Sequence, residues 1–76
     1  MNELIKNADF LNTWNFFNAY LLEAHGIILT EAKKNEQLNM LAALSRNDVE
    51  MAIEILEINI SNGNTIIIKP SIDEFV

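Results

Sequence analysis

The stretch SRNDVEMAIEILEINIS, residues 45–61, carries the strongest signal for the fold. At helical spacing it forms two apolar rows and a third row made only of acids. The first apolar row is Val49, Ala52, Ile53, Leu56 and Ile60, the second is Met51, Ile55 and Ile58, and the acidic row is Glu50, Glu54 and Glu57. A chain of 76 residues has little core in which to bury two faces of one helix. We therefore expect either that other segments cover the second apolar row or that a second molecule binds it.

The polar residues at the start of this stretch predict a short turn between two helices. Ser45, with Asp48 three positions later, has the spacing of a capping box. A preceding helix is predicted over residues 31–44, because Thr30 is a good N-cap. The first half of that helix, residues 33–37, is polar and is expected to face solvent. A link of two or three residues between helices is typical of an antiparallel αα-hairpin.

The stretch LNMLAALSRNDVEMAIEIL, residues 38–56, resembles one hairpin of a HEAT-type helical repeat in its leucine and alanine spacing and its polar turn. The chain holds no second copy of the pattern, so a repeat array is not supported. The resemblance implies a way of packing two helices and implies no ligand.

Another amphipathic helix is predicted over residues 7–24, where Asn7 or Asp9 can cap the free amides. Its apolar stripe is Phe10, Trp14, Phe17, Leu21 and Ala24. Aromatic side chains in such a stripe are typical of a core, but Phe16 or Tyr20 could instead point outward and anchor a partner. His25 lies where a helix end favours a cation, and Gly26 is the usual residue for the left-handed position after it.

Two short segments have the composition of β-strands, Ile27–Leu29 and Thr65–Lys69, although the first could instead be a buried connector. Asn62-Gly63 permits two interpretations, since Gly63 could end a helix and Asn-Gly also favours a hairpin that pairs residues 57–61 with 64–69. We favour the helix, because its apolar rows continue through Ile60.

The expected fold class is mainly α with minor β (α+β). It is a compact three-helix domain spanning residues 1–76, with an αα-hairpin, one or two short strands and a tail, 71–76, that is loose or docks on a partner.

The chain is acidic, with a formal net charge of −6 and an isoelectric point near 4.4. Residues 48–76 hold six acids and a single base, Lys69. Such a charge repels nucleic acid and anionic lipid and attracts basic surfaces.

Neither a signal peptide nor a membrane-spanning run is present in the sequence, which favours a cytoplasmic protein. The eleven asparagines and eleven isoleucines are typical of AT-rich coding sequence, as in many phages and low-GC bacteria.

The residues needed for common catalytic and metal sites are missing. The chain has no cysteine, one histidine and two glycines, which leaves no disulfide, no thiol zinc site and no phosphate loop. Glu54 and Glu57 form a Glu-x-x-Glu pair but lack the histidine of bundle metal sites. We therefore expect no enzymatic activity, no cofactor and no metal. Oligomerisation is the remaining way to stabilise so small a domain.

Two functions are compatible with these features. The first is a small non-enzymatic protein-binding regulator or inhibitor, of a kind that phages encode, which engages a basic partner such as a nucleic-acid-binding protein. The second is a structural or assembly protein that forms a small homo-oligomer. A plain solvated face is the simpler interpretation of the acidic row. The residues expected to contact the partner are Glu50, Glu54, Glu57, Met51, Ile55 and Ile58.

Overall fold

Three α-helices and one short 3-10 helix make up the part of the chain, residues 3–67, that the computed structural model describes. The 3-10 helix η1 spans Glu3–Lys6 and the first long helix, α1, spans Ala8–His25. Helix α2 spans Glu31–Ser45 and α3 spans Val49–Ser61. The three predicted helices are therefore confirmed, and residues 57–61 belong to α3 instead of forming a strand.

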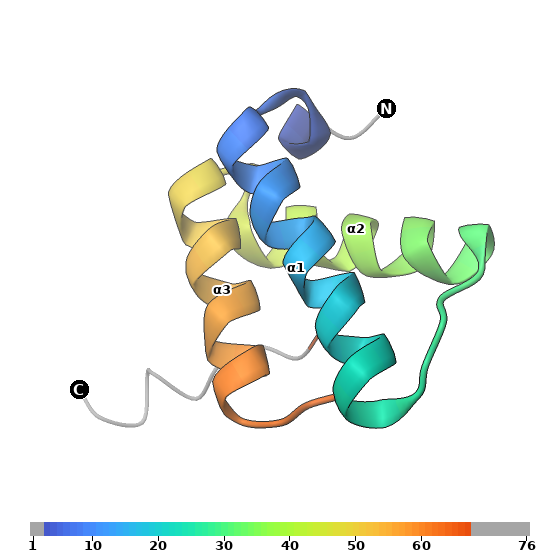
Figure 1. Ribbon diagram of the computed structural model, residues 1–76. Helices are drawn as coiled ribbons and strands as arrows, with labels where there is room; N and C mark the ends of the chain where they lie inside the picture. Colours follow the sequence, from blue (N-terminus) through green and yellow to red (C-terminus); the bar gives the residue numbers. More distant parts are fainter. Residues whose placement is uncertain (1–2, 68–76) are drawn as a thin grey trace.

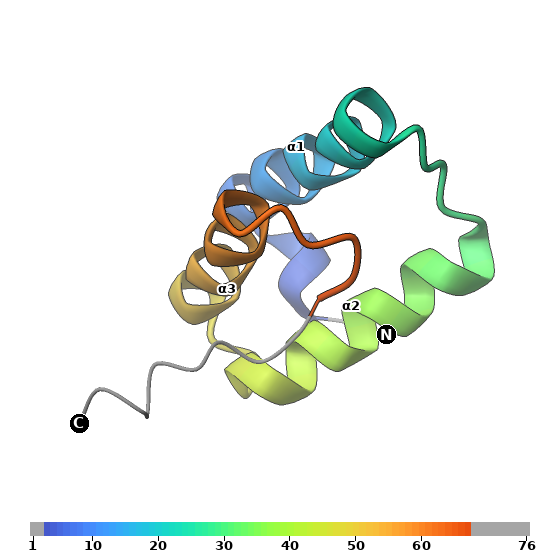
Figure 2. The same cartoon turned by 90° about the horizontal axis from the view of Figure 1, so that it is seen from below.

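The helices form two layers. Helices α1 and α3 lie side by side and run in the same direction, and α2 crosses behind them (Figure 1). Helix α3 packs against both α1 and α2, which makes it the central helix. The space between α2 and the other two helices is occupied by η1 and by the segment after α3, residues 62–67 (Figure 2).

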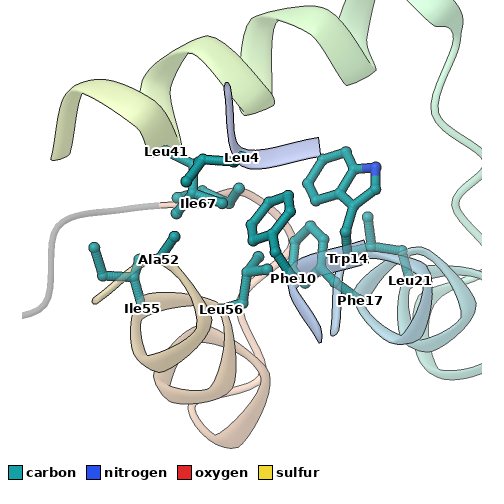
Figure 3. Close-up of a cluster of buried hydrophobic side chains, with 10 residues drawn as sticks. All are labelled: Leu4, Phe10, Trp14, Phe17, Leu21, Leu41, Ala52, Ile55, Leu56 and Ile67. Atoms are coloured by element: carbon teal, nitrogen blue, oxygen red, sulfur yellow. The ribbon is translucent and has the colours of Figure 1, made fainter. Parts of the chain in front are cut away.

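The core is built from one face of each helix and from two flanking segments. The predicted stripe of α1 is buried at Phe10, Trp14, Phe17 and Leu21, whereas Ala24 is exposed. Neighbouring rings along this stripe stack, with centroids 6.3 Å apart for Phe10 and Trp14 and 5.9 Å apart for Trp14 and Phe17. The core is completed by Leu4, Leu41, Ala52, Ile55, Leu56 and Ile67 (Figure 3).

Each long helix begins at a side chain that caps a free amide. The acceptors are Asn7 Oδ1 for Phe10 N at 3.0 Å, Thr30 Oγ1 for Lys33 N at 3.2 Å, and Asp48 Oδ1 for Met51 N at 3.1 Å. The capping box expected at Ser45 is wrong, because Ser45 is the buried last residue of α2. Asp48 caps α3 alone.

The predicted β component is wrong for the described residues, because residues 3–67 contain no strand. Residues 27–29 form a connector without regular secondary structure, and the Ile27 N–H donates back to Leu21 O, closing the left-handed turn at Gly26. Residues 65–67 are irregular, and the Ile67 N–H donates to Gln37 Oε1 at 2.8 Å where a strand would have a neighbouring carbonyl. Side-chain and turn hydrogen bonds thus replace the expected ladder. Residues 68–69 and the tail 71–76 lie outside the described residues.

The predicted antiparallel αα-hairpin is also wrong in its geometry. Three residues link α2 to α3, as the sequence indicated, but Arg46 and Asn47 both have positive φ angles, 56° and 62°. Two consecutive left-handed residues turn the chain sharply, and α2 and α3 cross instead of lying alongside each other (Figures 1 and 2). The packing implied by the resemblance to a HEAT-type hairpin is therefore not found.

None of the helices within residues 3–67 combines the length and the apolar character that crossing a membrane requires.

Candidate partner-binding surface

The acidic row of α3 forms an exposed surface, which we call the acidic stripe and define as Glu50, Glu54 and Glu57. It lies on the side of α3 opposite the buried Ala52 and Leu56. Among residues 3–67 the ion pairs are Lys6–Glu3 at 3.4 Å and Lys33–Glu36 at 3.6 Å, so neither involves the stripe. The three carboxylates are therefore not neutralised by any described base and can interact with an external cation.

The second apolar row of α3 is divided by the fold. Met51 is 43% exposed and Ile58 is half-buried. Ile55 is only 3% exposed and belongs to the same core cluster as Ile67, which follows α3 in the chain. Of the six residues expected to contact a partner, the structure thus brings the three glutamates and Met51 to the surface, leaves Ile58 partly accessible and places Ile55 in the core.

A groove of about 540 Å³ runs beside the acidic stripe, between α1 and α3. Phe16 of α1 is 61% exposed there, which agrees with the outward orientation considered for it from the sequence. Glu57 belongs to both the stripe and the groove, so charge and apolar surface meet at this residue. The groove is lined by Asn12, Thr13, Phe16, Glu57, Ile60 and Ser61.

A second hollow was not anticipated from the sequence. It measures about 410 Å³ and lies between residues 27–30, the N-terminal half of α2 and Thr65–Ile66. Ile28 is 78% exposed at this hollow, and Met40 and Ile66 are also exposed. The sequence predicted a short strand or a buried connector at residues 27–29 and a strand at 65–69, and neither prediction indicated that Ile28 and Ile66 would be exposed side by side at one hollow.

Tyr20 and His25 make a structural contact. The Tyr20 hydroxyl donates to Asn64 O at 2.8 Å and lies 3.0 Å from His25 Nε2. The hydroxyl thereby joins the end of α1 to the segment after α3. Among the described residues, no group of three or more His, Cys, Asp or Glu side chains is arranged to hold a metal ion.

Comparisons with known proteins return no relative from which a function could be transferred. No protein-family model matches the chain, and no curated protein or solved structure is significantly similar to it. We therefore infer a function from the surfaces described above.

Proposed function

We propose that the protein is a small non-enzymatic protein-binding regulator or inhibitor that engages a basic surface of a partner protein. The observation that carries the proposal is the position of three unpaired, exposed glutamates directly beside a groove that contains the exposed ring of Phe16. The stripe supplies charge and the groove supplies a place for an apolar side chain of the partner.

The two parts of this surface have complementary roles. A field of one sign attracts an oppositely charged protein and raises the rate of encounter, and the effect weakens as salt screens it. Charge alone contributes modest affinity, whereas an aromatic residue packed in a groove is typical of the residues that dominate binding energy. Glu57 and Phe16 line the same groove, so one partner segment can contact both.

Affinity capture from the native host with matched charge variants tests the proposal. The stripe variant is Glu50→Gln, Glu54→Gln and Glu57→Gln, and the control is Glu23→Gln, Glu31→Gln and Glu36→Gln, three exposed acids on α1 and α2. Both variants change the net charge by the same amount. We expect a basic protein to be retained by the wild type and by the control, to be lost with the stripe variant, and to elute in high salt.

A Phe16→Ala variant tests the apolar half of the surface. It should weaken binding to the captured partner without changing the salt dependence, because the phenylalanine side chain carries no charge. Equal retention by the wild type, the stripe variant and the control would contradict the proposal, as would a captured protein without a basic surface.

Self-association is a second candidate function, favoured by the exposed apolar side chains around the hollow next to α2. An apolar patch of this kind on so small a protein is a typical interface between subunits. Ile28→Lys places a charge at the most exposed large apolar side chain of residues 3–67, and Asn35→Lys places the same charge on a polar face of α2. Light scattering should give a dimer for the wild type and Asn35→Lys and a monomer for Ile28→Lys. A monomeric wild type at high concentration would exclude this candidate.

A further inference from the structure

We infer that Asn62 is a site of spontaneous deamidation, and that the folded turn after α3 controls how fast the reaction occurs. Of the eleven asparagines in the chain, only Asn62 precedes a glycine. Asn62 and Gly63 are both exposed, and apart from Gly63 and its two chain neighbours no heavy atom lies within 4 Å of the position that a Gly63 Cβ would occupy. The Gly63 nitrogen is therefore the least hindered backbone nucleophile that follows an asparagine in this chain.

The reaction requires only water and the chain itself. The Gly63 nitrogen loses its proton to hydroxide and attacks Asn62 Cγ, forming a new C–N bond. The Cγ–Nδ2 bond then breaks, and the amide nitrogen takes up a proton and leaves as ammonia. Water opens the resulting five-membered imide at one of its two carbonyls. Opening at Cγ leaves the main-chain peptide bond to Gly63 intact and gives aspartate at position 62, whereas opening at the main-chain carbonyl gives isoaspartate.

The native turn opposes this ring closure in two ways. The Gly63 N–H donates to Ile60 O at 3.0 Å, so the nucleophile is engaged in a hydrogen bond. Asn62 has a ψ of −2°, which eclipses the Gly63 nitrogen with the Asn62 backbone nitrogen instead of with Cβ. A near-planar imide ring needs the second arrangement, so the turn must open before the ring can form. Opening also strains the bond from Asn64 N to Asn59 O, 3.0 Å long.

The fold ties this turn to all three long helices. Tyr20 of α1 donates to Asn64 O at 2.8 Å, and Asn59 of α3 accepts at Oδ1 from Asn64 Nδ2 at 2.8 Å. Gln37 of α2 accepts from Ile67 N, and the Ile67 side chain is fully buried. The deamidation rate in the folded protein should therefore depend on how often the hydrogen bonds that hold residues 62–67 to the helices break locally.

Aspartate or isoaspartate at position 62 should weaken the same hydrogen bonds. Deamidation adds a carboxylate at the C-terminal end of α3, where the helix dipole disfavours negative charge. Isoaspartate also inserts a methylene into the backbone between the helix and Gly63, which shifts the hydrogen bonds made by Gly63 and Asn64. Deamidation is thus a slow, irreversible change that weakens the contacts between residues 62–67 and the helices as the protein ages.

The test follows isoaspartate at each asparagine by peptide mass spectrometry during incubation of the full chain at mildly alkaline pH. In urea we expect Asn62 to react faster than every other asparagine, and Gly63→Ala to slow it. In native buffer the reaction at Asn62 should be slower than in urea. Tyr20→Phe, which removes one anchor of the turn, should raise the native rate roughly 2- to 10-fold, the factor that corresponds to one hydrogen bond, and leave the rate in urea unchanged.

Ser45→Ala is the matched control, because it removes a hydroxyl that donates to Ala42 O at 3.5 Å, at the far end of α2 from the turn. It should leave the native rate at Asn62 unchanged. If Asn62 is no faster than the other asparagines in urea, it is not the preferred site. If the native and urea rates are equal, or if Ser45→Ala accelerates the reaction as much as Tyr20→Phe does, local opening of the turn does not control it.

Discussion

At the scale of single residues, two buried amides determine how the chain after α3 is held. Gln37 Oε1 accepts from Ile67 N at 2.8 Å. Asn59 donates through Nδ2 to Ile55 O at 2.8 Å and accepts at Oδ1 from Asn64 Nδ2. Both side chains are buried, and no buried side-chain polar atom among the described residues lacks a hydrogen-bond partner. The amides thus provide hydrogen bonds that a strand partner would otherwise have supplied.

Replacing Gln37 with leucine tests this role. Leucine fills the site with an apolar side chain of similar size but leaves the Ile67 N–H without its acceptor, so the free energy of unfolding should fall by about 1–3 kcal/mol. Urea denaturation followed by Trp14 fluorescence measures the change. Asn39→Leu, at an exposed position of the same helix, should change it by less than about 0.5 kcal/mol. Equal losses in the two variants would show that the Gln37 hydrogen bond is not the cause.

These amides also mark the limit of prediction from local sequence. Gln37 falls in the polar first half of α2, which the sequence predicts to face solvent, because its own helix gives no sign of burial. It is buried because a segment thirty residues later in the chain passes over it and needs an acceptor. A contact of this kind depends on tertiary packing and is not visible in local periodicity. The N-caps Asn7 and Thr30, in contrast, act within their own helix ends: Thr30 was predicted correctly, and Asn7 was one of the two candidates, with Asp9.

At the scale of elements, α3 has one buried face, formed by Ala52, Ile55, Leu56 and Asn59. The periodicity predicted the helix and the exposed acidic stripe, but it could not decide what covers the second apolar row. That depends on residues 62–67, which turn back toward α2 and place Ile67 in the core (Figure 3). The Asn-Gly pair was compatible with a helix end and with a hairpin, and the left-handed Gly63, φ 71°, is found in the first of these roles.

Lysine substitutions along this row should therefore have unequal effects. Ile55→Lys places a charge in the core and should lower the free energy of unfolding by more than about 3 kcal/mol, enough to unfold much of so small a domain. Met51→Lys, one turn earlier at a surface position, should change it by less than about 0.5 kcal/mol. Circular dichroism during urea titration measures both. Similar stability of the two variants would contradict the placement of Ile55 in the core.

At the scale of the whole molecule, the net charge of −6 is distributed unevenly between the helices. Within residues 3–67, α2 carries Lys33 and Lys34 beside its acids and forms the pair Lys33–Glu36, whereas α3 carries acids and no base. Glu54 has like-charged neighbours one turn away on both sides, Glu50 and Glu57. The same change in net charge should therefore have opposite effects on stability at the two helices.

A pair of double variants measures this difference. Glu54→Gln with Glu57→Gln removes repulsion along the acidic stripe and should raise the free energy of unfolding by about 0.5 kcal/mol. Glu31→Gln with Glu36→Gln removes a favourable charge in the first turn of α2 and the ion pair with Lys33, and should lower it by about 0.5 kcal/mol. Urea denaturation at low salt measures both, and the difference should shrink as added salt screens the charges. Shifts of the same sign would mean that total charge outweighs local placement. Opposite shifts would mean that the stripe costs the folded chain free energy, which a basic partner bound at α3 would offset.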